Sequence, residues 1–158
     1  MFNIASIKNL AVLLKPLGAK GVSVTAGGSG DATLVTGNTV DRFTTGGGTI
    51  TNVGLSVIGD CTLASSQTLG ITIGYQTSAN GSDWDTAVYV FGASESDYQT
   101  VASATGSVGK VVSLDCSGLK RYIRVVYKPN LSASGTDTAR LSGGVIAVVN
   151  NVESLENA

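Results

Sequence analysis

Short segments that alternate between apolar and polar residues recur along most of this chain, and glycine-rich stretches separate them. Such alternation with a period of two is typical of β-strands with one buried face, and glycine clusters predict the turns between strands. Many short strands at nearly regular spacing favour an all-β, antiparallel sandwich, jelly-roll or Greek-key like, over alternating strands and helices. The predicted strands cover residues 21–26, 32–36, 39–43, 49–57, 69–77, 84–91, 98–102, 110–114, 119–128 and 138–149.

The clearest of these segments is a hairpin predicted over residues 71–87. Its first half alternates apolar and polar residues, and Asn80-Gly81 follows as the turn, because both residues tolerate a positive φ. Trp84 is the only tryptophan and leads the predicted return strand. A buried core position is the commoner fate of such a residue, so we expect Trp84 to be a structural anchor of the sandwich.

Two later segments predict strands in the interior of the fold. Residues 119–128 read as a central strand, with Tyr122 as a second structural anchor, and Pro129 is expected to end it because proline cannot donate to a ladder. Residues 145–149 are apolar at every position, which predicts burial on both faces, under this chain or under another subunit.

The length of 158 residues fits one domain with a sizeable core. We expect an N-terminal arm or short helix over residues 1–20, a sandwich domain over residues 21–150 and a flexible tail over residues 151–158. The arm carries apolar residues at helical spacing before Pro16, so it fits either an amphipathic helix or an extended segment. It either packs on its own domain or reaches a neighbour. Its apolar stretch is too short for an export signal or a membrane span.

Charge is scarce in this chain. Only 13% of residues are charged and the net charge is −1, without any basic run. Binding to nucleic acid by phosphate neutralisation needs a denser positive surface, so neither a nucleic-acid partner nor a membrane partner is expected.

The residue types that carry most enzyme chemistry are also scarce. The chain has no histidine, which removes the commonest general base and the commonest metal ligand. Asp83 and Asp85 flank Trp84 and are expected to be solvated acids at a turn rather than a glycosidase pair. With Asn80 and Ser82 they form only a weak calcium signal, because the spaced ladder of an EF-hand is missing. The sequence therefore predicts no enzyme, no cofactor and no metal site.

The two cysteines, Cys61 and Cys116, leave two alternatives open. One disulfide is arithmetically possible, but a secreted scaffold normally carries more. Two reduced, buried thiols are the preferred interpretation.

Three segments resemble small structural proteins of tailed bacteriophages. The segment YQTSANGSDW at residues 75–84 resembles a strand-turn-strand of those proteins, and LKRYIRV at residues 119–125 looks like one of their later strands. The opening LAVLLKP at residues 10–16 is similar to their apolar arm. The resemblance covers the arm and roughly the second half of the chain, and its motifs also occur in carbohydrate-binding and fibronectin-like sandwiches.

The resemblance implies a capsid decoration (cement) protein or another minor virion protein. Such a protein would bind the outer surface of a phage head, join major capsid subunits and form a dimer or trimer. It would be made in the host cytoplasm and remain in the virion. The alternatives are a tail-tube or head-completion component and a carbohydrate-binding sandwich. We assign the expected contact in part to the arm residues Ile4, Ile7, Leu10, Leu13 and Leu14.

Overall fold

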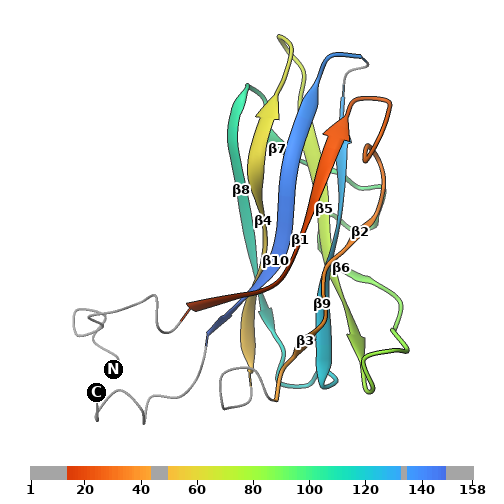
Figure 1. The fold of residues 1–158 in the computed structure, drawn as a ribbon, viewed down its shortest axis with the longest axis vertical. Helices are drawn as coiled ribbons and strands as arrows, with labels where there is room; N and C mark the ends of the chain where they lie inside the picture. Colours follow the sequence, from red (N-terminus) through yellow and green to blue (C-terminus); the bar gives the residue numbers. More distant parts are fainter. Residues whose placement is uncertain (1–13, 44–49, 133–134, 149–158) are drawn as a thin grey trace, which may run out of the picture.

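The computed structural model describes residues 14–43, 50–132 and 135–148, which form an all-β sandwich (Figure 1). No helix occurs among these residues. The strands, in chain order, are β1 (Leu14–Thr25), β2 (Val35–Thr36), β3 (Val40–Asp41), β4 (Asn52–Thr62), β5 (Leu69–Ser78), β6 (Val88–Phe91), β7 (Gln99–Ala102), β8 (Gly106–Asp115), β9 (Tyr122–Leu131) and β10 (Thr138–Val148).

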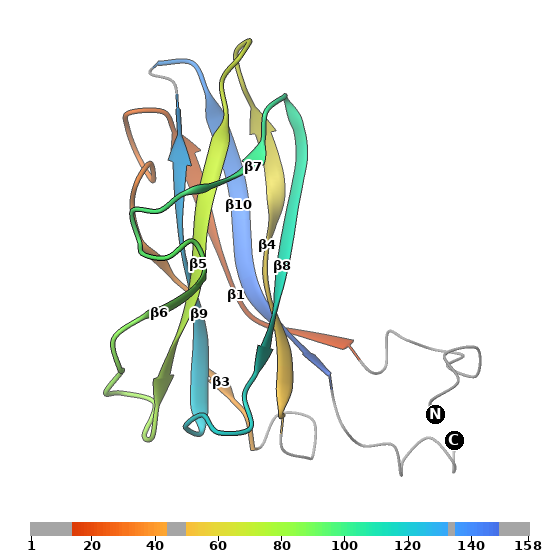
Figure 2. The same cartoon turned by 180° about the vertical axis from the view of Figure 1, so that it is seen from behind.

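The strands form two antiparallel sheets that pack face to face (Figures 1 and 2). The first sheet has the order β1-β10-β4-β8. The second sheet has the order β2-β9-β5-β6, with β3 also pairing with β9 and β7 with β5. The predicted fold class is confirmed, and each predicted strand overlaps an observed one.

The core lies between the two sheets and consists mainly of aliphatic side chains. Tyr127 of β9 is its one fully buried aromatic residue among the described part of the chain. Its ring lies against Gly143 of β10, where a Cβ atom would come within 2.4 Å of the ring. Its hydroxyl donates to the carbonyl of Lys20 at 2.8 Å, and burial raises the pKa of Tyr127 to about 12. This side chain therefore ties the centre of the second sheet to the edge of the first.

Strand β1 begins earlier than the sequence indicates. Residues 14–20, which we assigned to the arm, belong to this strand, and Leu14 pairs with Val148 of β10. The register shifts between Leu17 and Lys20. Spacing along one segment cannot reveal a partner strand more than a hundred residues away. Of the two alternatives for the arm, residues 14–20 adopt the extended one. The remainder of the arm, residues 1–13, and the predicted tail lie outside the described residues.

Strand β9 continues through Pro129, so the prediction that this proline ends the strand is wrong. The carbonyl of Pro129 accepts a hydrogen bond from the amide of Ala32, on the side of the strand that faces away from β5. The N and C=O of one strand residue point to the same side, so the missing N–H of Pro129 costs the ladder with β5 nothing.

The connection from β5 to β6 is wider than a two-residue hairpin. Only Gly81 has a positive φ, at 79°. The side-chain oxygen of Asn80 instead accepts the amides of Ser82 and Asp83, both at 2.9 Å. Because asparagine side chains readily imitate a backbone turn, Asn80 organises this loop without a left-handed conformation of its own.

The apolar end of β10 is buried on one face and half-buried on the other. Val145 and Ala147 lie in the core, and Ile146 is half-buried on the opposite face. Pairing with β1 and β4 covers the edges of β10 but not its outer face, so Ile146 is not fully buried and the prediction of burial on both faces holds only in part.

Strand β8 is the last strand of the first sheet among the described residues. Its Lys110 occupies a core-facing position of the strand, and the ammonium group lies 4.3 Å from the centre of the Phe91 ring of β6. A lysine in this position closes the side of the sandwich with a charge over an aromatic ring.

Arg42 is a buried cation that the sequence reasoning missed. It follows β3, is 1% exposed, and its guanidinium donates to the carbonyls of Ile50, Leu119 and Lys120 at 3.1, 2.5 and 2.9 Å. Such a guanidinium joins loops far apart in sequence at one end of the sandwich, because one fork can satisfy several carbonyls.

The two cysteines are buried and free, as the preferred interpretation predicted. Cys61 lies opposite Gly106 at one end of the β4–β8 pair, whereas Cys116 follows Asp115, which lies opposite Asn52 at the other end. Nine residues of strand separate the two positions by about 30 Å, which no disulfide within one chain can bridge. Burial raises the pKa of Cys116 to about 11, so this thiol stays protonated at neutral pH.

Candidate interaction surfaces

The outer face of the second sheet carries an aromatic face, which we define as Trp84, Tyr89, Tyr98 and Tyr122. All four side chains are half-buried. Tyr122 occupies an outward position of β9, since its neighbour Ile123 points into the core. Glycines on β5 leave room for two of these residues, because a Cβ at Gly74 would come within 3.1 Å of the Tyr89 ring and one at Gly70 within 2.9 Å of Tyr98 Cβ.

Cations of β9 lie between these rings. The guanidinium of Arg124 is 4.0 Å from the centre of the Trp84 ring and donates to the side-chain oxygen of Gln76 at 3.0 Å. Partial burial lowers the pKa of Arg124 from its ordinary value. Lys128 lies 5.9 Å from the centre of the Tyr98 ring. Trp84 therefore lies in the connection between β5 and β6, on the solvent side of the sheet, and is not part of the core.

The carboxylates beside Trp84 accept hydrogen bonds from other side chains of the protein. Asp85 accepts from the Thr77 hydroxyl at 2.7 Å and from Lys120 at 2.5 Å, and these bonds lower the pKa of its carboxyl. Asp83 accepts from the side-chain amide of Asn80 at 2.7 Å. Among the described residues, no three histidines, cysteines or acids come together as metal ligands would.

The outer face of the first sheet is different in character. We define the smooth face as nine outward residues in three rows across β10, β4 and β8, none of which carries a charge. The rows are Ser142, Ile58 and Gly109, then Gly144, Ser56 and Val111, then Ile146, Gly54 and Ser113. Gly144 and Ser56 of the middle row are buried, and the other seven residues are half-buried or exposed. Gly54 lets the apolar side chains meet, since a Cβ there would lie 2.9 Å from Val111 Cγ1 and 3.7 Å from Ile146 Cβ.

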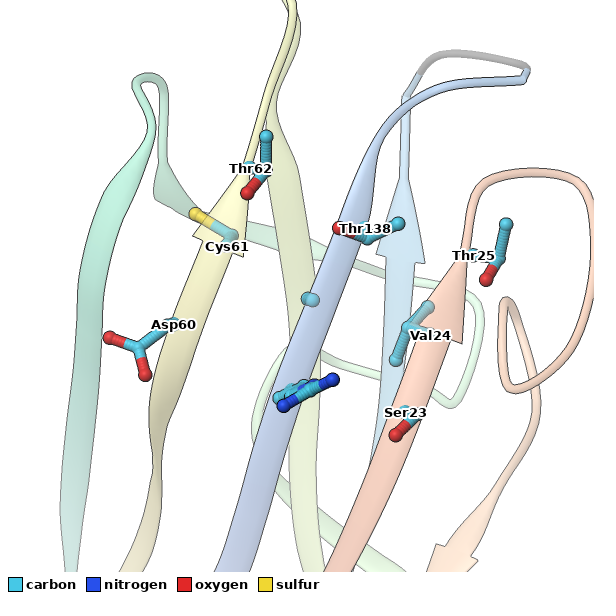
Figure 3. A pocket seen from close by; sticks show the side chains of 9 residues that line it. Ser23, Val24, Thr25, Asp60, Cys61, Thr62 and Thr138 are labelled. Carbon is cyan, nitrogen blue, oxygen red and sulfur yellow. The ribbon is translucent and has the colours of Figure 1, made fainter.

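A polar groove lies beyond one end of the smooth face (Figure 3). It has a volume of about 410 Å³. One set of paired residues across β1, β10 and β4 consists of three threonines, and the next set holds Arg140 between Ser23 and Asp60. Asp60 accepts from the Ser107 hydroxyl at 3.1 Å. At the other end, a hollow of about 390 Å³ lies between the ends of β4 and β8, near Gly54 and Leu114.

The structure describes only part of the predicted contact residues. Leu14 is placed in β1, while Ile4, Ile7, Leu10 and Leu13 lie outside the described residues. The smooth face was not found from sequence, although the glycines and serines that recur at alternate positions in residues 52–58 and 107–113 are a visible trace of it. In the described part of the chain, no helix is long and apolar enough to cross a bilayer.

Comparison with known proteins leaves the chain without an assigned family. No family model matches it, and no curated protein matches it. A structure of infectious bursal disease virus, Gx strain, is similar over 88% of this chain and 32% of that chain, with 16% identity and a TM-score of 0.38. The VP2 subviral particle of infectious bursal disease virus is similar over 91% of this chain and 45% of that chain, with 12% identity and a TM-score of 0.29. The chain thus spans less than half of each, and similarities this low indicate neither a shared family nor a shared function.

Proposed function

We propose that this chain is a non-enzymatic structural subunit of a virus particle. In its most specific form, the proposal is that the protein binds the outer surface of a tailed-bacteriophage head and stabilises contacts between major capsid subunits. The observation that carries it is the smooth face, because nine neighbouring outward positions without a charge suit contact with protein better than contact with water.

The proposed partners are the major capsid protein and further copies of this chain, in a dimer or trimer. Because the symmetry of a shell repeats each contact, a small interface on each copy can stabilise the whole particle. The arm residues Ile4, Ile7, Leu10 and Leu13 supply part of the contact with neighbouring subunits. The protein would reside in the virion, after assembly in the host cytoplasm.

Deletion of residues 1–13 tests this role. The deletion leaves β1 intact from Leu14 onward, so we expect a folded protein that occupies purified phage heads at least about tenfold less, a loss of about 1.4 kcal/mol. Occupancy is measured by quantitative gel analysis of heads after sedimentation. The matched control is deletion of residues 151–158, which should bind like the full chain. Undiminished binding by the first variant would remove the arm from the proposal, and intact virions without this chain would refute the virion role.

A carbohydrate-binding role is the second candidate, because Trp84 lies on the aromatic face and not in the core. Sugars bind proteins through aromatic rings that offer a flat apolar surface, and a row of such rings on a sheet provides one. This candidate and the capsid role use opposite faces of the sandwich, so they are separable by mutation.

Substitution of Trp84 by alanine tests the carbohydrate role. If the aromatic face binds a glycan, Trp84→Ala should abolish binding on a glycan array while the melting curve remains cooperative. The control is Phe43→Ala, which removes an exposed aromatic residue outside the aromatic face. An array on which the unaltered protein binds no glycan would count against this role.

A further inference from the structure

The smooth face is unusual because its large apolar side chains are both exposed and adjacent. Ile58 is 55% exposed and Val111 is 53% exposed, and they occupy neighbouring rows of β4 and β8. Ile146 continues the strip on β10, since Gly54 has no side chain to separate it from Val111. Single exposed apolar residues are ordinary, but a continuous strip marks a surface that another chain covers.

The hollow between the ends of β4 and β8 adjoins this strip. Gly54 and Ser113 belong to both, Val53 and Leu114 add apolar lining to the hollow, and Asn52 and Asp115 add polar lining. A strip that ends in a hollow suits a linear segment that carries one or more large apolar side chains.

We propose that residues 1–13 of a second copy of this chain bind across the smooth face. Nine of these thirteen residues are apolar, and Lys8 is their only charged side chain. A segment of this composition matches a face that carries no charge, because neither side then loses the hydration of an ion on contact. The proposal names the partner of the arm, and in that respect it rests on the role proposed for the arm above.

The dimensions favour an arm over packing of two smooth faces against each other. Three strands about 4.8 Å apart and five residues along each strand give a face of only a few hundred Å². A stable interface between two proteins buries about 800 Å² on each partner, so the face is too small to join two sandwiches by itself. Thirteen residues can extend over about 43 Å, which is enough to cross the strip and reach the hollow.

The course of β1 favours an arm from a neighbour. Beyond the shift at Leu17, the strand pairs with the last residues of β10, and both strand ends leave the sandwich toward the same side (Figures 1 and 2). The start of β1 at Leu14 lies outside the sandwich body in both views. The chain that precedes Leu14 therefore starts at a projecting end of the sheet, from which a second copy is within reach.

Sedimentation velocity of the full-length protein gives the first test. We expect the unaltered chain to sediment as a dimer or trimer, and both the chain without residues 1–13 and Val111→Arg to sediment as monomers. The matched control is Val88→Arg, which places the same charge at a valine that is 49% exposed on β6, in the other sheet. This control should remain associated. A monomeric unaltered protein at 100 µM would refute the proposal, as would a Val111→Arg variant that stays associated.

A mixing experiment identifies the two partners of the contact. The deleted chain retains the smooth face but has no arm, and Val111→Arg retains the arm but has a charged face. Neither should associate alone, whereas an equimolar mixture should form a 1:1 complex. A mixture that remains monomeric would show that the arm does not bind this face of another copy. Circular dichroism melts of both variants check that each is folded.

The same measurements separate this inference from the proposed function. They use the isolated protein, without phage heads. A chain that associates through its arm but does not bind heads would keep the inference and refute the capsid role. A chain that binds heads as a monomer would keep the capsid role and refute the inference.

Discussion

Replacement of Arg42 by alanine is expected to lower the free energy of unfolding by about 3–5 kcal/mol. Arg42 is 1% exposed, and its guanidinium donates to the carbonyls of Ile50, Leu119 and Lys120. Alanine leaves these acceptors unsatisfied and opens a cavity, and both changes destabilise a protein. Urea denaturation followed by tryptophan fluorescence measures the loss.

Two further variants make this result specific. Arg140→Ala removes an exposed arginine of the first sheet and should change stability by less than about 0.5 kcal/mol. Arg42→Lys keeps the charge but not the planar fork, so its loss should fall between those of the two alanine variants. A loss below about 1 kcal/mol for Arg42→Ala would show that the carbonyls find other partners.

The second large effect is expected at Gly59 of β4. A Cβ there would lie 1.9 Å from the carbonyl oxygen of Arg140 in β10. The atoms nearest to that Cβ all belong to the backbone in the middle of the sheet. Backbone cannot move aside as a flexible side chain does, so Gly59→Ala should cost roughly 3 kcal/mol, at the upper end of overpacking effects. Thermal and urea melts measure the change.

Gly21→Ala is the matched control for this substitution. Its Cβ would lie 3.6 Å from the Leu141 carbonyl, which is an ordinary contact on the other side of β10. Since alanine also reduces the freedom of the unfolded chain, we expect this variant to equal or slightly exceed the original stability. Equal melts for the Gly59 and Gly21 variants would contradict the predicted clash.

Local alternation was sufficient to predict the strands. Strand periodicity depends on neighbours two residues apart, so Ile123, Val125 and Tyr127 could be assigned to one apolar face, and all three are buried in the core. The two-sheet sandwich followed from the number and spacing of the strands, and it is the fold observed.

Features that depend on cross-strand register could not be predicted. Pro129 stays in β9 because its nitrogen points away from β5, and sequence does not reveal to which side a residue's backbone groups point. The pairing of Leu14 with Val148 joins opposite ends of the chain. Arg42 resembles an ordinary polar residue of a short strand in the sequence, because two of its three acceptors, Leu119 and Lys120, are 77 and 78 residues away.

The candidate surfaces also depend on register. Ile58 and Val111 are more than fifty residues apart, and only the pairing of β4 with β8 makes them neighbours. Trp84 was expected in the core because a lone tryptophan usually provides core volume, but the guanidinium of Arg124 supplies its packing partner outside the sheet. A single sequence shows which residues are apolar but does not show which of them the fold leaves uncovered.

Lys110, on the edge strand β8 of the first sheet, limits how this protein can polymerise. Among the described residues, β8 has a free side on which alternate residues present unpaired backbone groups, and such an edge invites other chains to add strands without end. Any strand added there would have to desolvate Lys110 against Phe91, which disfavours growth through main-chain hydrogen bonds. The charge on Lys110 therefore works against edge-to-edge addition of copies at β8.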